Sequence, residues 1–145
     1  MAYEHGATRD GRQVYVRAHI VLDGGAYASS STAVVSNAAC FAVGPYDCPN
    51  ATIDAYVAYT DNPPCGAMRG FGAVQTCFAY ESQMDLLAAE LGMDPVDLRI
   101  RNAMTTGSRF PTGSSSRARR RSPSCWSGCA PCPCRSAWRA VYLTC

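Results

Sequence analysis

The clearest periodic pattern in the chain lies between residues 73 and 91, and it fixes one element of any fold the chain can adopt. Apolar side chains recur there at steps of three and four residues, on one side of an α-helix: Ala73, Cys77, Tyr80, Met84, Leu87 and Leu91. Gly92 suits the end of this helix, where a left-handed residue is common. Asp94 and Pro95 suit the cap and the first position of a second helix, which we expect to run to about Met104.

Two segments before these helices have the composition of β-strands. Residues 12–23 are rich in Val, Ile and Tyr and end at a Gly-Gly pair, and residues 51–60 alternate apolar and other side chains. Residues 32–41 are small and apolar and favour a short buried helix. We therefore expect an α+β body of strands, then a loop, then two helices. Because two strands rarely form a stable sheet alone, this body is typical of a piece of a larger fold.

The chain changes character near residue 114. All 11 acidic residues precede this point, whereas residues 114–145 hold six of the 13 Arg and no acid, and five of the nine Cys crowd the last 21 residues. We therefore divide the chain into a body, residues 1–113, and a tail, residues 114–145. The tail has no periodic apolar face, and we expect it to be disordered.

Composition also excludes some classes of protein. The chain has 145 residues, of which 48% are hydrophobic and 17% charged, as in an ordinary globular domain. No apolar run approaches the roughly 20 residues of a membrane span. The first 11 residues lack the apolar core of a signal peptide. The expectation is a cytoplasmic protein without a membrane or a nucleic acid as its partner.

The candidate binding site is the junction before the long helix, residues 61–75, which read DNPPCGAMRGFGAVQ. Its glycines permit positive φ or a close approach of a ligand to the backbone. The helix that follows has free N–H groups and a partial positive charge at its start, so the junction could hold an anion or a cofactor. Phe71 between two glycines could place its ring in a cavity and stack on a flat substrate. The alternative is a glycine-rich turn with Arg69 solvated and Phe71 in the core.

The same junction and the helices after it also match a known family. Residues 61–104 read DNPPCGAMRGFGAVQTCFAYESQMDLLAAELGMDPVDLRIRNAM, and upstream the chain carries LDGGAYASSS and GPYDCPN. This sequence resembles the molybdopterin-binding large subunit of the molybdenum hydroxylases, the xanthine dehydrogenase and aldehyde oxidase family. It is most similar to bacterial subunits of the xanthine dehydrogenase D type. The resemblance covers about residues 2–113 and implies that the body is a fragment of the molybdopterin-binding domain.

The resemblance implies roles for particular residues. One loop lines the molybdenum cofactor with backbone groups, and its residues here are Gly66, Ala67, Met68, Arg69 and Gly70. Phe71 takes the position that stacks on a heteroaromatic substrate. Asn37 takes a substrate-side position at which purine-oxidising relatives often carry arginine, which puts a purine substrate in doubt.

The resemblance also implies an activity and its partners. The family hydroxylates an N-heterocycle such as xanthine or hypoxanthine, or an aldehyde, with oxygen from water. Its cofactor is a molybdenum-pterin, which we expect in the cytosine dinucleotide form, and electrons leave to iron–sulfur and FAD partners. The catalytic glutamate and most pterin-binding segments of the family have no counterpart in this chain. We therefore expect no catalytic residue and no direct metal ligand here, and a fragment that is inactive without the remainder of the large subunit.

The tail leaves three readings open. Cys125, Cys129, Cys132 and Cys134 suggest zinc, although four ligands within ten residues leave no room for two opposed knuckles. The RARRR run suggests nucleic acid. The rival to the enzyme fragment is therefore a small stand-alone binding protein with a basic, Cys-rich arm. The reading we favour is a frameshift product, because GC-rich codons for the tail, read in the neighbouring frame, give an amphipathic helix similar to the family's continuation.

Overall fold

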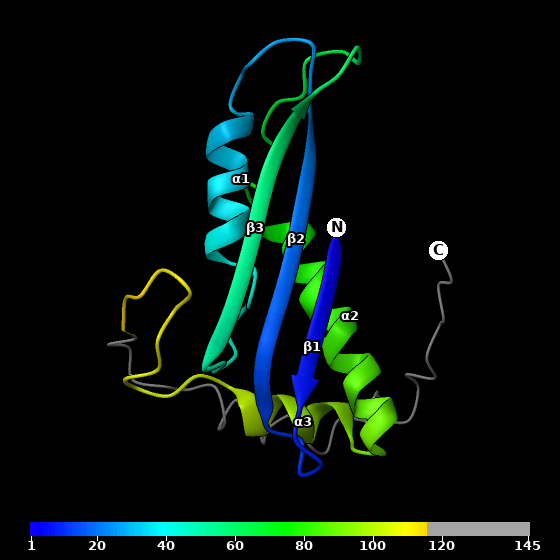
Figure 1. Ribbon diagram of the computed structural model, residues 1–145, viewed down its shortest axis with the longest axis vertical. Helices are drawn as coiled ribbons and strands as arrows, with labels where there is room; N and C mark the ends of the chain where they lie inside the picture. Colours follow the sequence, from blue (N-terminus) through cyan, green and yellow to red (C-terminus); the bar gives the residue numbers. More distant parts are fainter. Residues whose placement is uncertain (116–145) are drawn as a thin grey trace.

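A three-stranded sheet with helices on one face makes up the part of the chain that the computed structural model describes, residues 1–115 (Figure 1). The elements in chain order are β1 (Ala2–Ala7), β2 (Gln13–Gly25), α1 (Ser31–Cys40), β3 (Asn50–Tyr59), α2 (Ala73–Leu91) and α3 (Pro95–Asn102). The order of strands in the sheet is β1-β2-β3. Helix α1 packs along β3, α2 packs along β1, and α3 crosses the lower end of the sheet in Figure 1.

The sheet mixes two kinds of pairing. β1 and β2 are antiparallel, whereas β2 and β3 are parallel and are joined through α1. A parallel pair requires such a crossover, because its strands start from the same edge of the sheet. On β2, Val16, Ala18 and Ile20 face the helices and are buried, while the alternate residues face outward and are exposed. This period of two confirms the strand predicted from residues 12–23.

Strand β1 is the element that the sequence prediction missed, so the expectation of two strands in the sheet was wrong. Its six residues, AYEHGA, include a glutamate, a histidine and a glycine and have little β propensity of their own. The strand forms because it pairs with β2 through a short turn at Gly11, whose φ of 82° suits glycine. The other predicted strands and helices lie within a few residues of those observed.

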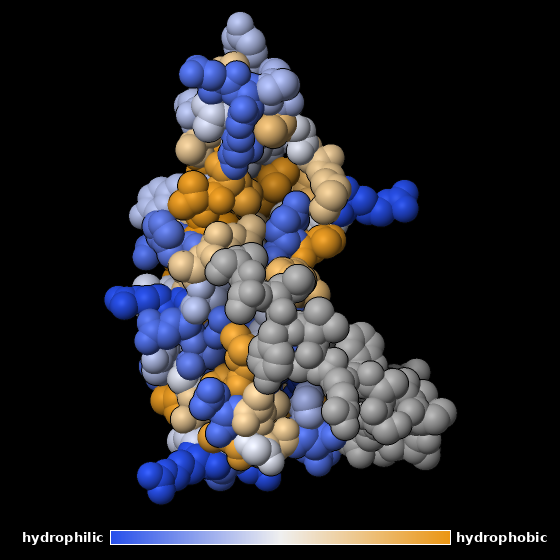
Figure 2. Space-filling model, turned by 90° about the vertical axis from the view of Figure 1, so that its right-hand side faces the viewer, coloured by the Kyte–Doolittle hydropathy of each residue, from blue (hydrophilic) through white to orange (hydrophobic). Residues whose placement is uncertain are grey.

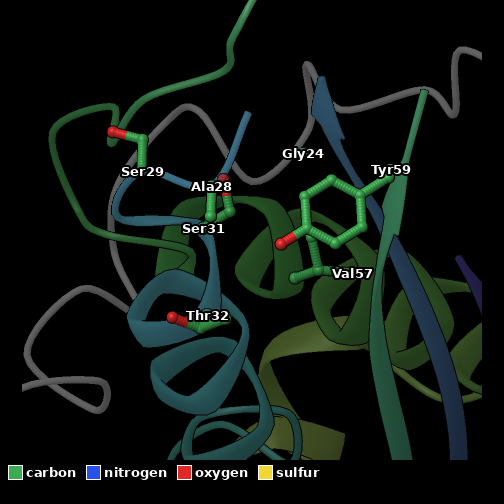
Figure 3. Close-up of a pocket in the computed structure, with 7 residues that line it drawn as sticks. All are labelled: Gly24, Ala28, Ser29, Ser31, Thr32, Val57 and Tyr59. Atoms are coloured by element: carbon green, nitrogen blue, oxygen red, sulfur yellow. The ribbon is translucent and has the colours of Figure 1, made fainter. Parts of the chain in front are cut away.

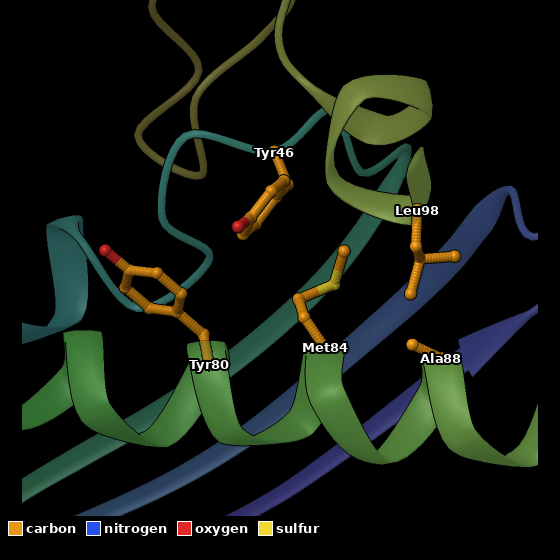
Figure 4. Packing of buried hydrophobic residues seen from close by; sticks show 5 residues of the cluster. All are labelled: Tyr46, Tyr80, Met84, Ala88 and Leu98. Carbon is orange, nitrogen blue, oxygen red and sulfur yellow. The ribbon is translucent and has the colours of Figure 1, made fainter. Parts of the chain in front are cut away.

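The main core lies between α2 and α3. One row of α2, with residues four apart, is buried, and it consists of Thr76, Tyr80, Met84 and Ala88. Figure 4 shows Tyr80, Met84 and Ala88 pointing from α2 toward Tyr46 and Leu98. The predicted stripe is confirmed at Tyr80 and Met84. Its members Cys77, Leu87 and Leu91 pack at the margin of this core and are partly buried.

Helix α3 begins as its sequence predicts. Oδ1 of Asp94 accepts the backbone N–H groups of Val96 and Asp97 at 2.8 and 3.1 Å. Asn102 at the other end is buried, and its side chain accepts from Gln13 N and donates to the Gly11 carbonyl oxygen, both at 2.7 Å. These two bonds attach the β1–β2 turn to α3.

His5 gives the fold a dependence on pH. It faces α2 from β1, and burial lowers its pKa to about 4, below the ordinary value of about 6.5. The unfolded chain therefore binds a proton near pH 6.5, whereas the folded chain binds it only near pH 4. We expect the free energy of unfolding to fall by about 1–2 kcal/mol as the pH drops from 7 to 5, with allowance for partial exposure.

Urea unfolding at pH 7 and pH 5 measures this effect in the wild-type and His5→Gln chains. The His5→Gln chain should lose most of the decrease. His19→Gln is the matched control, because His19 lies on the outward, exposed face of the same sheet. An equal decrease in all three chains would show that His5 is not the group responsible.

The predicted tail lies almost wholly outside the described residues. Ser114 and Ser115 follow a turn. Phe110 N donates to the Ser114 carbonyl oxygen at 2.8 Å, and the backbones of Arg109 and Ser115 form an isolated antiparallel β-bridge. The expected disorder, the zinc and nucleic-acid readings and the frameshift all concern residues 116–145 and stay predictions. No helix within residues 1–115 is long and apolar enough to cross a membrane.

Candidate functional site

The loop between β3 and α2 is tied to β2 at its start. Thr60 Oγ1 donates to Oδ1 of Asp23 at 2.6 Å, and Asn62 Nδ2 donates to the other carboxylate oxygen. Gly25 N also donates to Asp23, at 2.9 Å. The hydrogen bond from Thr60, followed by those from Gly25 and Asn62, lowers the pKa of Asp23. A carboxylate that stays ionised thus fixes the point at which the loop leaves the sheet.

A second attachment follows at Cys65. Its N–H donates to the Gly24 carbonyl oxygen at 3.3 Å, and its own carbonyl oxygen accepts from Ser31 Oγ at 3.0 Å. Gly25 is required here, because its φ is 72° and an added Cβ would lie 2.3 Å from the Pro63 carbonyl oxygen. The Gly-Gly pair that ends β2 therefore lets the two prolines of the loop pack closely against the sheet.

The five residues after Cys65, Gly66 to Gly70, are all exposed, and we call them the open span. A Cβ added to Gly66 would meet nothing within 4 Å. The Met68 side chain is 54% exposed, and Arg69 forms no ion pair within residues 1–115. The open span thus presents its backbone and one cation to the surroundings.

A left-handed bend closes the open span. Gly70, Phe71 and Gly72 have φ values of 94°, 51° and 91°, and Phe71 is the one non-glycine residue with positive φ in the described part of the chain. Phe71 N donates to the Met68 carbonyl oxygen at 2.9 Å, and Ala73 N donates to that of Gly70 at 3.0 Å. Phe71 is 39% exposed, so it is not packed in the core as the alternative interpretation held.

Helix α1 holds the bend in place. A Cβ added to Gly72 would lie 2.5 Å from the Val34 carbonyl oxygen and 3.0 Å from Ala38 Cβ, so the backbone at Gly72 lies directly against α1. One residue before Ala38, Asn37 donates its Nδ2 to the Phe71 carbonyl oxygen at 2.7 Å. Both ends of the open span are thus fixed by α1, at Ser31 and at Asn37.

Two further features suit a ligand at this place. No side chain caps the start of α2 at Gly72, and Ala73 N already donates to the Gly70 carbonyl oxygen, so it is the N–H groups after Ala73 in the first turn that are available to a ligand. Oε1 of Gln75, in that first turn, is buried and has no hydrogen-bond partner within residues 1–115. A buried oxygen without a donor costs about 1–3 kcal/mol. The exposed backbone of the open span and the uncapped start of α2 thus fit a polar cofactor.

A small cavity adjoins the first attachment and is too small to be the cofactor site. It has a volume of about 70 Å³ and lies between the end of β3 and the start of α1 (Figure 3). The Tyr59 ring points across it toward Ser31 and Thr32. Sites for small molecules usually measure about 300–1,000 Å³. Gly66 to Gly70 do not line this cavity and are all exposed, so walls from elsewhere are needed to enclose a ligand against the open span.

Sequence reasoning found part of this arrangement. The structure brings together Asn37 and Phe71, which lie 34 residues apart. It places the predicted residues Gly66 to Gly70 on one exposed stretch next to them. The supporting residues Asp23, Ser31 and Gln75 were missed, because nothing in their sequence context shows which distant backbone groups they meet.

Comparison with known proteins identifies the fold. Residues 1–103 match the family model described as "Molybdopterin cofactor-binding domain". The chain is 48% identical over 108 residues to the nicotinate dehydrogenase large molybdopterin subunit of Eubacterium barkeri, which covers 74% of this chain and 25% of that protein. It is 39% identical over 97 residues to a probable xanthine dehydrogenase subunit of the D type from Bacillus subtilis, covering 67% of this chain and 13% of the relative.

A solved structure agrees with these relatives. The aldehyde oxidoreductase from Desulfovibrio desulfuricans superposes with a TM-score of 0.84 at 26% identity, over 89% of this chain and 14% of that one. The chain thus spans a quarter or less of the length of each of these proteins. The expected α+β fragment of a molybdopterin-binding domain is confirmed, and the chain belongs to the molybdopterin cofactor-binding domain family of the molybdenum hydroxylases.

Proposed function

We propose that this chain is part of the large subunit of a molybdenum hydroxylase, and that its open span forms one wall of the cofactor chamber. The observation that carries this proposal is the fixing of Gly66 to Gly70 at both ends, by Ser31 and Asn37, with an exposed backbone between. Backbone groups of Gly66, Ala67, Met68, Arg69 and Gly70 would hold the molybdenum-pterin, in its cytosine dinucleotide form. When bound, this cofactor supplies a redox centre for hydroxylation with oxygen from water.

The substrate side of the chamber would begin at the bend. Phe71 is held with its side chain partly exposed at the end of the open span, where it could stack on a flat ring. The Asn37 side chain donates a hydrogen bond to the carbonyl oxygen of Phe71. The names of two relatives include nicotinate and xanthine, both N-heterocycles, and that of the solved structure includes an aldehyde. We favour an N-heterocycle, because an aromatic ring in this position selects for a flat partner.

The chain needs other parts to act. Exposed apolar side chains continue from the open span along α2, at Met68, Phe71, Val74, Phe78 and Leu86. Hydrophobic residues also gather on the upper part of the face shown in Figure 2. Such surface is typical of protein that another segment covers. We propose that the remainder of the large subunit covers it, that iron–sulfur and FAD subunits accept the electrons, and that the fragment is inactive without them.

Substitution of Phe71 tests this function. A suitable holoenzyme is a chimera of the nicotinate dehydrogenase large subunit in which residues 1–103 of this chain replace the matching segment. Loss of stacking costs about 1–3 kcal/mol per ring, so Phe71→Ala should lower kcat/KM for nicotinate by about 10- to 100-fold. Tyr56→Ala is the matched control, since Tyr56 is 55% exposed on β3 and lies outside both the bend and the apolar surface of α2. Equal kinetics in both variants would contradict a substrate role for Phe71.

A further inference from the structure

The bend at residues 70–72 contains one residue in an unfavourable conformation. Gly70 and Gly72 adopt positive φ without strain because they have no Cβ. Phe71 does have a Cβ and is bulky, and its φ of 51° lies in the left-handed region that such residues avoid. Other contacts must therefore offset the cost of this conformation, and one of them is the hydrogen bond from Phe71 N to the Met68 carbonyl oxygen at 2.9 Å.

Helix α1 supplies further contacts that hold the bend, from residues Val34, Asn37 and Ala38. Gly72 lies against Val34 and Ala38, which are one helical turn apart, and this contact fixes the position of the bend along the axis of α1. Asn37 Nδ2 donates to the Phe71 carbonyl oxygen at 2.7 Å, which fixes the peptide plane after Phe71. The bond lies at the surface of the described residues, although Asn37 itself is partly buried.

We propose that Asn37 is a positioning residue, whose amide holds Phe71 in the left-handed conformation and thereby sets the direction of the Phe71 ring. This inference rests on the proposed function, since the direction of the ring matters for turnover only if the ring meets substrate. The amide N–H is what the position requires. A leucine would fill the same volume without a donor, and an aspartate would turn a second acceptor toward the carbonyl oxygen.

Substitution of Asn37 in the full 145-residue chain tests the hold on Phe71. Asn37→Leu removes the donor to the Phe71 carbonyl oxygen and should raise the ratio of unfolded to folded chain about tenfold. Phe71→Gly keeps this carbonyl oxygen, so Asn37→Leu should have at least as large an effect in the Phe71→Gly chain. A ratio in the Asn37→Leu chain that stays within about twofold of the wild type would overturn the proposal.

A measurement on the unsubstituted chain tests whether Asn37 holds Phe71 even if the Asn37→Leu chain does not fold. In chain labelled with ¹⁵N and ¹³C, NMR should show a scalar coupling across the hydrogen bond between Asn37 Nδ2 and the Phe71 carbonyl carbon. The side-chain amide protons of Asn37 should also exchange with solvent more slowly than those of Asn50, whose exposed side chain bonds Val14. No coupling, together with faster exchange at Asn37 than at Asn50, would overturn the proposal.

Kinetics of the cofactor-loaded chimera separate this proposal from the proposed function. Asn37→Leu should raise KM for nicotinate about 5- to 10-fold with little change in kcat, and should add nothing to Phe71→Ala. A normal KM together with the coupling described above would show that Asn37 holds Phe71 but that the ring does not meet substrate. That result would overturn the proposed substrate role and leave the hold on Phe71 intact.

Discussion

Replacement of Gly72 by alanine is expected to lower the free energy of unfolding of the full chain by about 2–4 kcal/mol. Two effects add at this position. A φ of 91° is unfavourable for any residue with a Cβ, and the new methyl group would lie 2.5 Å from the Val34 carbonyl oxygen, which belongs to a helix and cannot move freely. The bend would have to leave α1, and the start of α2 would move with it. Urea unfolding followed by circular dichroism measures the change.

Two other glycines separate these effects. Gly92 has a φ of 62° but nothing within 4 Å of an added Cβ, so Gly92→Ala should lose about 1 kcal/mol from conformation alone. Gly66 has open space and no positive φ, so Gly66→Ala should stay within about 0.5 kcal/mol of the wild type. The order Gly72, Gly92, Gly66 is therefore expected, and a loss at Gly72 no larger than at Gly92 would show that the bend does not pack against α1.

Replacement of Arg99 by methionine is expected to lower the free energy of unfolding by about 2–4 kcal/mol. Arg99 is 9% exposed in α3, and its Nε donates to Glu81 Oε2 on α2 at 2.7 Å. Oε1 of the same carboxylate accepts from the Tyr46 hydroxyl at 2.8 Å, and burial, followed by this bond, raises the pKa of Tyr46. Without Arg99, a partly buried carboxylate would lose its counter-charge in the main core. Urea unfolding at pH 7 measures the loss.

The other carboxylate that Arg99 meets provides the control. Asp85 lies 2.8 Å from Arg99 Nη1, but its side chain is 62% exposed. Solvent screens such a pair, so Asp85→Asn should change the free energy of unfolding by less than about 1 kcal/mol. Similar losses in the Arg99 and Asp85 variants would mean that the buried pair with Glu81 contributes little to the packing of α3 on α2.

The elements that the sequence predicted correctly are those whose own residues carry the signal. Helix α2 has a regular apolar stripe, and α3 begins at Asp94-Pro95, so both were placed to within a few residues. Strand β1 has no such signal, because its stability comes from pairing with β2 and packing on α2. Arg99 was missed for a similar reason. A charged residue is expected to be exposed when its sequence alone is considered, because its distant partner, here Glu81, is not known.

The candidate site also combines residues that the sequence marks directly with residues whose role depends on distant contacts. The glycines of residues 66–72 mark the open span and the bend directly, because only certain backbone conformations require them. The residues that hold the loop lie 34 or more positions away in sequence, at Asp23, Ser31 and Asn37. Only Asn37 among these was singled out, and that came from the family resemblance rather than from its contacts. Long-range hydrogen bonds of this kind have no local pattern in the sequence.

The most direct test of the account is the structure of the cofactor-loaded chimera that carries residues 1–103 of this chain. The account predicts that backbone atoms of Gly66 to Gly70 lie in contact with the molybdenum-pterin, and that Phe71 borders the substrate space beside the metal. A structure in which the cofactor binds elsewhere, with Gly66 to Gly70 facing solvent, would contradict it.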